Sequence, residues 1–389
     1  MSLPRDVRLL IYSMAPNGIL ASYIGIFVAG YLPTSGFSSS DVALVLGVEG
    51  LTAITAAIPL GILSDRKGRK SPMISGNLLA GLASMLLFAS RGLYSYVFAA
   101  FLFGIAEASV LSTWNAIIAD GTDITNRTKA FSLTFILSSF SSSVGFALPF
   151  VFPYVESIFM LTQEKVHYLT LLILATANIL STLFMAIILR NYRERPHIPV
   201  ERKKEELSHI FKLALSNSII AFGAGLIIPF VPTWLLHNFG LPDSVSGPVL
   251  AIGGLTISFG AGLSPRLASR LGIVRGAALT TASSLTFMFL LAFIKDAYLA
   301  VIIYVVRTML MNMSNPLIDT LVMNLTRSEN RGFVSALVTI MWRLPNSIST
   351  IFAAFLLRFV NFDALWLVAS FFYAIGITIF YVYFRAQKF

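Results

Sequence analysis

Twelve apolar runs, each long enough to cross a lipid bilayer, follow one another along this sequence of 389 residues. A transmembrane helix needs about 20 apolar residues to span about 30 Å of hydrocarbon. The runs are continuous and do not alternate with polar residues, which predicts helices rather than the strands of a membrane barrel. They lie at 9–32, 42–63, 73–90, 96–118, 130–153, 167–189, 209–236, 245–264, 276–294, 297–322, 333–357 and 364–384.

The composition supports the bilayer as the solvent for most of the chain. Hydrophobic residues make up 56% of it and charged residues 12%, against about 25% charged residues in an ordinary soluble protein. Soluble cores could not bury so much apolar surface. We therefore expect an all-α integral membrane protein, whose first apolar run is retained as a helix rather than cleaved as a signal peptide.

The basic residues indicate the orientation in the membrane. With the N-terminus in the cytoplasm, 22 Lys and Arg fall in cytoplasmic segments and 4 in outer loops. Cytoplasmic loops carry this excess, so we expect a multi-pass protein of the cell (plasma) membrane with both termini in the cytoplasm. The same distribution accounts for the net charge of +10 without a nucleic-acid partner. Because the chain has no cysteine, disulfides and thiol chemistry are excluded.

The sequence divides into two related halves. The long polar stretch 191–208 contains two prolines and mixed charges, which predicts a cytoplasmic linker between bundles at 1–190 and 209–389. At a constant offset of 204 residues, identical residues recur in three loops: Gly36 and Gly240, Arg66 and Arg270, Gly68 and Gly272, Thr122 and Thr326, Asn126 and Asn330, Arg127 and Arg331. This repeat of about 200 residues predicts twelve transmembrane helices in two pseudo-symmetric six-helix bundles.

The loop between the second and third runs carries the most specific motif. It has the sequence GILSDRKGRK over residues 61–70 and resembles the G-x-L-[AS]-D-R-x-G-R-[RK] loop of the Major Facilitator Superfamily, at the place where that family carries it. The resemblance implies the family's two-bundle fold and secondary transport by alternating access. The simpler interpretation of its basic residues is cytoplasmic orientation alone.

The motif also points to a conformational latch on the cytoplasmic side. Glycines at its two ends permit close helix approach and a tight turn. The resemblance implies that Asp65 faces residues 331–333 and that Arg69 pairs with Asp120. The expected latch residues are Gly61, Asp65, Arg66, Gly68, Arg69 and Asp120.

The second half lacks the charges of this latch. At the offset of 204, Asp65 corresponds to Ser269, Arg69 to Ile273 and Asp120 to Asn324. We therefore expect a latch in the first half alone.

Four ionisable side chains stand out inside the predicted spans: Glu49, Glu107, Arg307 and Arg343. Each costs at least about 2.5 kcal/mol at the bilayer centre, which favours a functional role or a pair facing a cavity. Buried carboxyls can exchange a proton near neutral pH, so Glu107 and Glu49 are candidates for proton coupling. Arg343 and Arg307 present planar donors to an anionic group and are candidates for substrate binding. The alternative is that the two acids and two bases only neutralise one another.

Further candidates for substrate binding are uncharged residues in or near the same spans: Asn17, Trp114, Asn115, Asn315 and Asn346. Trp114 shares a helical stripe with Glu107. Asparagines in membrane helices more often form hydrogen bonds between helices, which is the alternative role.

The expected function is proton-coupled transport of a small organic solute, with export of amphipathic, drug-like compounds favoured by apolar spans rich in Phe and Met. Against it, the G-x-x-x-G-P-x-x-G-G pattern of the family's drug/proton antiporters is reduced here to Gly145 and a later Pro149. The alternative is an organic-anion transporter or exchanger that uses Arg307 and Arg343.

Other classes of function fit the sequence less well. A channel or scramblase would have no use for a latch, and an enzyme or ATP-driven pump is disfavoured because the sequence has no HExxH motif and no Walker loop. We expect no cofactor and no metal. The expected partners are a small-molecule substrate, protons and the lipid bilayer, and the expected state is a monomer.

Overall fold

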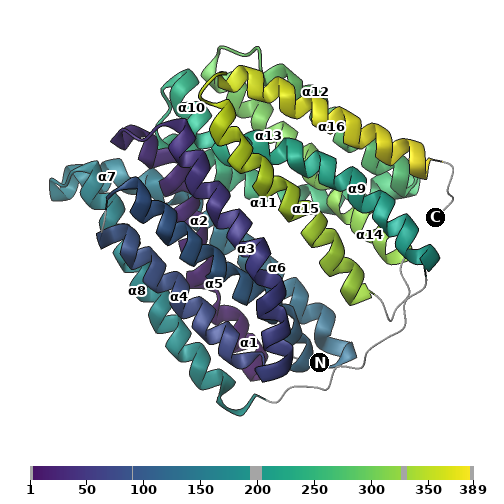
Figure 1. Cartoon of the computed structure of the whole chain (residues 1–389), viewed down its shortest axis with the longest axis horizontal. Helices are drawn as coiled ribbons and strands as arrows, with labels where there is room; N and C mark the ends of the chain where they lie inside the picture. Colours follow the sequence, from purple (N-terminus) through teal and green to yellow (C-terminus); the bar gives the residue numbers. More distant parts are fainter. Residues whose placement is uncertain (1–2, 90, 193–203, 326–330, 386–389) are drawn as a thin grey trace. The chain divides into compact units, whose positions relative to one another are not determined.

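A computed structural model describes residues 3–89, 91–192, 204–325 and 331–385, and every regular element in these ranges is helical (Figure 1). The first half contains α1 Arg5–Ser13, α2 Ala15–Ile26, η1 Phe27–Tyr31, η2 Leu32–Ser35, α3 Ser39–Lys67, α4 Lys70–Ala89, α5 Leu93–Asp120, α6 Ile124–Ala147, η3 Leu148–Val151, α7 Phe152–Phe159, α8 Gln163–Ile188 and η4 Leu189–Asn191. The second half contains α9 Lys204–Ile227, η5 Ile228–Phe230, α10 Val231–Phe239, α11 Asp243–Leu271, α12 Ile273–Leu291, α13 Ala297–Met313, α14 Asn315–Leu325, α15 Arg331–Leu356 and α16 Phe362–Phe384.

The helices account for all twelve predicted spans. Among the described residues, 10 helical stretches are long and apolar enough to cross a membrane. The two other predicted spans fall in α11 and α15, which are helices of 29 and 26 residues. The all-helical membrane fold is confirmed, and the count of twelve is consistent with it.

Prolines divide four of the predicted spans into two helical segments. A proline lacks the N–H that an interior helical position donates, so it is tolerated best in the first turn of a helix. Pro16, Pro149, Pro229 and Pro316 each stand at the second position of a new segment. Single apolar runs therefore become α1 and α2, α6 and α7, α9 and α10, and α13 and α14.

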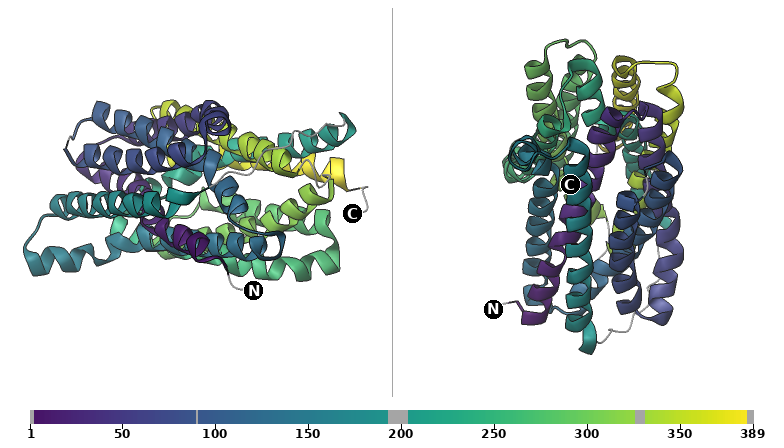
Figure 2. Two further views of the ribbon diagram at one scale, coloured as in Figure 1. Left: turned by 90° about the horizontal axis from the view of Figure 1, so that it is seen from below. Right: turned by 90° about the vertical axis from the view of Figure 1, so that its left-hand side faces the viewer.

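The helices pack into two compact units. Unit 1 comprises Met1–His197 and Pro242–Ala251, and unit 2 comprises Ile198–Leu241 and Ile252–Phe389. In unit 1, α5 packs against α3 and α4, α4 packs against α8, and α2 packs against α6 (Figure 1). In unit 2, α9 packs against α15 and α16, and α12 packs against α13 and α16. Figure 2 shows the helices of each unit from two further directions.

The structure supports the internal repeat at the predicted offset of 204 residues. Helix α3 at 39–67 corresponds to α11 at 243–271, and the start of α5 at residue 93 corresponds to the start of α13 at residue 297. The described glycines with positive φ form two pairs at this offset: Gly36 with Gly240, and Gly68 with Gly272. The two halves thus repeat both helix lengths and turn geometry.

Each unit also has an apolar core built from equivalent positions. One core lies among α1, α4, α5, α6 and α8, and the other lies among α9, α12, α14, α15 and α16. Buried residues at the offset of 204 occur in both cores: Met73 and Ala277, Ile117 and Leu321, Ile118 and Val322, Ala130 and Val334. The same packing scheme therefore stabilises both units, and differences in their polar residues stand out against it.

Candidate functional site

A charged cluster occupies the end of unit 1 at which α3, α5 and α8 finish. Arg69, in the turn between α3 and α4, places Nη1 2.5 Å from Oδ2 of Asp120, the last residue of α5. Tyr192, directly after η4, donates its hydroxyl hydrogen to the same carboxylate oxygen. The side chains of Arg69 and Asp120 are 13% and 8% exposed. The structure thus brings the two expected partners together and adds a tyrosine that the sequence did not suggest.

Burial and hydrogen bonding act in opposite directions on the cation of this cluster. Burial lowers the pKa of Arg69, but its hydrogen bonds to Asp120 and Tyr192 outweigh that effect and raise it. Burial, followed by the hydrogen bond to Asp120, raises the pKa of the Tyr192 phenol above its usual value. At neutral pH Arg69 therefore remains a cation and Tyr192 remains a neutral donor.

Gly68 gives the turn between α3 and α4 its shape. Its φ of +99° lies in the left-handed region, which residues with a Cβ rarely adopt. Its N–H donates a hydrogen bond to the carbonyl of Ser64 and ends α3. A Cβ at Gly61 would lie 3.9 Å from Cβ of Ser112, an ordinary contact. Of the two motif glycines, the described geometry requires only Gly68.

The remaining latch residues are less defined. Arg66 is exposed on α3. Asp65 belongs to α3 and residues 331–333 belong to α15, but their side chains lie outside the described part of the structure. The expected approach of Asp65 to residues 331–333 therefore stays a prediction.

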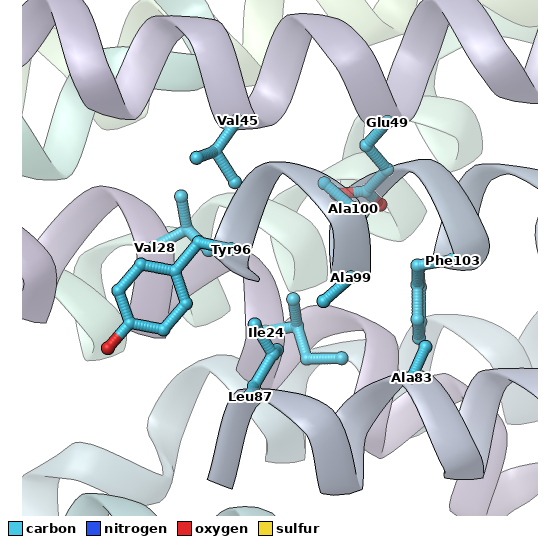
Figure 3. A pocket seen from close by; sticks show the side chains of 10 residues that line it. All are labelled: Ile24, Val28, Val45, Glu49, Ala83, Leu87, Tyr96, Ala99, Ala100 and Phe103. Atoms are coloured by element: carbon cyan, nitrogen blue, oxygen red, sulfur yellow. The ribbon is translucent and has the colours of Figure 1, made fainter. Parts of the chain in front are cut away.

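Glu49 lines a small pocket inside unit 1 (Figure 3). Its side chain extends from α3 toward α5, and the pocket wall also includes residues of α2, η1 and α4. The other lining residues are apolar apart from Tyr96. Glu107, the second acid expected in a span, is half-buried on α5. Both carboxyls belong to unit 1.

The structure places Arg307 in the interior of unit 2. It is 4% exposed on α13, and its Nη2 donates a 2.6 Å hydrogen bond to the hydroxyl oxygen of Tyr373 on α16. The same nitrogen lies 3.7 Å from the sulfur of Met288 on α12. The guanidinium thus binds side chains of α12 and α16. Arg343, on α15, is half-buried.

Two of the expected asparagines form hydrogen bonds within unit 2. Nδ2 of Asn346 on α15 donates to the carbonyl of Ala221 on α9 at 3.1 Å. Helix α9 comes so close here that a Cβ at Gly225 would lie 2.1 Å from the Asn346 carbonyl oxygen. Nδ2 of Asn315 donates to Oδ1 of Asn312 at 3.0 Å.

The other uncharged candidates lie in unit 1. Asn17 is half-buried on α2, and Asn115 is exposed on α5. Trp114 is half-buried on α5 and packs against the apolar core of unit 1. None of these positions identifies a bound solute, so their part in substrate binding stays a prediction.

Unit 1 also contains a buried acid–base pair that was not predicted from the sequence. Nε2 of His167 on α8 lies 3.0 Å from Oδ2 of Asp243, the first residue of α11. The side chains are 0% and 2% exposed. The available signal was their position, because His167 opens the predicted run 167–189 and Asp243 stands just before the run 245–264. Within the described residues, no group of three or more His, Cys, Asp or Glu could hold a metal ion.

Comparison with known sequences finds a family and two curated relatives. The family model described as Major Facilitator Superfamily matches residues 10–350 and 213–389. The inner membrane transport protein YajR of Escherichia coli K12 is 30% identical over 113 residues, which are 29% of this chain and 24% of that protein. An uncharacterized transporter of Buchnera aphidicola subsp. Schizaphis graminum is 28% identical over 147 residues, 38% of this chain and 33% of that protein. The chain thus matches a third or less of each relative's length.

Solved structures of several transporters have a similar fold. The POT family transporter PepTSo has a TM-score of 0.79 at 10% identity, over 99% of both chains. A bacterial homologue of the human lysosomal transporter Spinster, in an inward-facing and unoccupied conformation, has a TM-score of 0.75 at 15% identity, over 98% of this chain and 96% of that chain. The nucleoside transporter NupG has a TM-score of 0.75 at 12% identity, over 99% and 100%. At these identities the similarity shows the fold alone.

Proposed function

This chain belongs to the Major Facilitator Superfamily, and we propose that it is a secondary active transporter that moves a small organic solute across the plasma membrane by alternating access, coupled to protons. It is a multi-pass membrane transporter, since its family and its relatives are transporters rather than enzymes. Beyond membrane transport, we propose the coupling to protons, the small organic solute, the alternating-access cycle and the location in the plasma membrane.

The observation that carries the proposal is the cluster of Arg69, Asp120 and Tyr192 at one end of unit 1. A cycle between two conformations needs contacts that can form and break. The equivalent positions of unit 2 are Ile273, which packs against the apolar core of that unit, and Asn324, which is exposed. The charged contact in unit 1 therefore supports a latch that acts in one half alone.

The choice of solute depends on Arg307, which is buried, and Arg343, which is half-buried. An organic anion would need a guanidinium that it can reach. Arg307 is 4% exposed in the interior of unit 2, where it donates to Tyr373 and lies beside Met288, so an anion transporter would depend on Arg343. This favours an amphipathic, drug-like solute, and the organic-anion exchanger remains the second candidate.

We assign the coupled proton to Glu107, with Glu49 as the second candidate. Both acids lie in helices that span the membrane, where a carboxylate is costly and protonation relieves the cost. The apolar wall around Glu49 supports the same argument for that residue. The basic residues of the sequence favour termini in the cytoplasm, and we propose that the protein functions as a monomer.

The test is uptake into proteoliposomes of ethidium, a lipophilic cation, and of benzoate, an organic anion. We expect a pH gradient to drive the accumulation of ethidium, and Glu107→Gln to abolish that accumulation while ethidium exchange without a gradient persists. Glu156→Gln on α7 is the matched control and should leave accumulation unchanged. Full accumulation by Glu107→Gln would move the assignment to Glu49, and accumulation of benzoate alone would establish the anion transporter instead.

A further inference from the structure

Four polar side chains from three helices meet in the interior of unit 1. His167 and Gln163 come from α8, Tyr23 comes from α2, and Asp243 comes from the first turn of α11. Nδ1 of His167 lies 2.9 Å from the Tyr23 hydroxyl, and Nε2 lies 3.0 Å from Oδ2 of Asp243. Nε2 of Gln163 donates to Oδ1 of Asp243 at 3.3 Å. Both nitrogens of the imidazole therefore face polar atoms.

Burial makes the charges in this group costly unless they balance. His167 and Asp243 are 0% and 2% exposed, and Tyr23 is 0% exposed. Nε2 and Oδ2 are close, but their approach does not have the direction of a hydrogen bond. The position of Asp243 in the first turn of α11 favours its carboxylate through the helix dipole. An imidazolium at His167 would supply the missing counter-charge.

The Tyr23 hydroxyl can satisfy His167 in either protonation state. It lies within hydrogen-bonding distance of Nδ1 and also donates to the His167 backbone carbonyl at 3.2 Å. When the ring is neutral with its proton on Nε2, the hydroxyl can donate to Nδ1. When the ring is a cation, Nδ1 donates to the hydroxyl oxygen and the hydroxyl hydrogen turns to the carbonyl. The contact between Tyr23 and His167 is therefore kept in both states, and only the contact with Asp243 changes with the proton.

Aromatic rings enclose the imidazole on its other sides. The ring of Tyr31 stacks on it at 4.0 Å between centroids, and the ring of Phe152 on α7 meets it edge-on at 4.8 Å. Phe27 completes the enclosure at 6.0 Å. The face of a tyrosine ring stabilises a cation placed over it, and the rings keep water away. The enclosure therefore favours exchange of a single proton rather than binding of a larger ligand.

The nearest other charges lie on or against the helix of His167, and they include Lys165, which is exposed on α8. On its own helix, Glu164 forms an ion pair with Arg91, whose guanidinium lies 4.8 Å from the ring centroid of Tyr168. The titratable neighbours on other elements are Tyr23 on α2, Tyr31 on η1 and Asp243 on α11. Helix α7 contributes the carbon ring of Phe152. Asp243 is thus the facing carboxylate that can hold the proton at His167.

The start of α11 packs closely against unit 1 around this group. A Cβ at Gly247 would lie 2.2 Å from the carbonyl oxygen of Phe146, and a Cβ at Gly30 would lie 2.9 Å from Cβ of Asp243. The hydroxyl of Ser143 on α6 donates to the carbonyl of Ala251 at 3.3 Å. Helix α11 continues unbroken to Leu271, although only its residues up to Ala251 belong to unit 1. Loss of the Asp243 contact would release that packed segment.

We propose that His167, with Asp243 and Tyr23, is a proton-binding site separate from Glu49 and Glu107, and that its proton holds the start of α11 against unit 1. At low pH the imidazolium balances Asp243 and the segment stays packed. When a rise in pH removes the proton, the counter-charge is lost and the segment is released. The inference rests on the proposed alternating access, in which such a contact must open and close.

The test measures how accessible the start of α11 is as the pH changes. The chain has no cysteine, so Ser246→Cys, at a position that is 0% exposed, reports release of the segment through its rate of reaction with a small thiol reagent. The rate is divided by that of Ser157→Cys, an exposed position on α7, which corrects for the increase in thiolate with pH. In lipid nanodiscs we expect this ratio to rise on the order of tenfold from about pH 5.5 to about pH 8.

Two histidine variants decide whether His167 is responsible. His167→Gln, in the Ser246→Cys background, should make the ratio independent of pH, whereas His237→Gln, at an exposed histidine on α10, should leave the dependence intact. A ratio that does not change with pH, or a dependence that persists in His167→Gln, would overturn the proposal. Neither substrate nor a gradient is involved, so failure of proton-driven uptake would leave this result unaffected.

A measurement with His167 intact covers the case in which His167→Gln does not fold. Replacing the other three histidines, His197, His209 and His237, by glutamine leaves His167 as the sole imidazole. Nitrogen-15 chemical shifts of that ring should show a cation converting to the tautomer protonated on Nε2, over the same pH range as the change in thiol reaction. A ring that stays in one form between about pH 5 and 8 would refute the proton site.

Discussion

Two substitutions around Asp120 test whether the charged cluster of unit 1 acts as one contact. Tyr192→Phe removes one hydrogen bond to a charged group, for which values of about 1.5–3 kcal/mol are typical, and the half-buried position of Tyr192 favours the lower end. Arg69→Gln leaves a carboxylate that is 8% exposed without its counter-charge, which should cost about 3 kcal/mol. Arg69 and Tyr192 donate to the same oxygen of Asp120. The loss of unfolding free energy in the variant with both substitutions should therefore be smaller than the sum of the two single losses, by at least about 0.5 kcal/mol.

The assay is reversible unfolding in mixed micelles, followed by tryptophan fluorescence, with the free energy of unfolding compared across the four proteins. Tyr94→Phe, at a tyrosine that is 90% exposed at the start of α5, is the control and should change the free energy by less than about 0.5 kcal/mol. A shared contact at Asp120 is refuted if Tyr192→Phe lowers the free energy of unfolding no more than Tyr94→Phe does. It is also refuted if the losses caused by Arg69→Gln and Tyr192→Phe simply add in the double variant.

The raised pKa of Tyr192 determines how the difference in unfolding free energy between wild type and Tyr192→Phe depends on pH. A phenol whose pKa is higher in the folded protein contributes stability that is fully present below the unfolded value of about 10 and is lost as the pH rises through the folded value. The difference between wild type and Tyr192→Phe should therefore be constant between about pH 6 and 9 and shrink at higher pH.

Three further outcomes are expected. Gly68→Ala should cost about 1–3 kcal/mol of unfolding free energy because of its positive φ, whereas Gly61→Ala should cost less than about 0.5 kcal/mol because its Cβ would make an ordinary contact. Tyr373→Phe should lower the unfolding free energy by about 2 kcal/mol, since the buried arginine of α13 loses a charge-assisted hydrogen bond. In intact cells, Ser71→Cys should react with an impermeant thiol reagent only when the cytoplasmic face is opened, and Ser39→Cys should react from outside; the reverse pattern would contradict the proposed orientation.

Hydropathy predicts most of the fold because the bilayer imposes one rule on every span. Backbone groups in hydrocarbon must pair within the segment, so a long apolar run becomes a helix. The repeat was also readable, since turn glycines such as Gly68 and Gly272 must adopt positive φ in both halves. The proline breaks were less visible, because hydropathy does not report the missing N–H of a residue such as Pro149.

The candidate site was predictable only where a motif supplied the partner. Arg69 and Asp120 are 51 residues apart, and the family resemblance rather than any spacing brought them together. Tyr192 was missed because it lies where the linker begins and because tyrosines are common near membrane surfaces. Nothing local to the sequence marks it as a ligand of Asp120.

The direction of a side chain from its helix was the least predictable feature. Arg307 donates to Tyr373 on α16, a contact that the sequence does not reveal, and its expected part in substrate binding stays a prediction. His167 and Asp243 both stand near helix ends, where charges are unremarkable, so nothing local to the sequence marks them as partners. Only their packing shows that both are buried and face one another.

Counterflow of ethidium in proteoliposomes tests the central claim, transport by a carrier that alternates between two states. Vesicles loaded with unlabelled ethidium are diluted into a trace of labelled ethidium, without a pH gradient. A carrier should accumulate label transiently above equilibrium, with an initial rate that saturates as the ethidium concentration rises. A flux that rises linearly with concentration and shows no transient accumulation would contradict the account and indicate a passive pore.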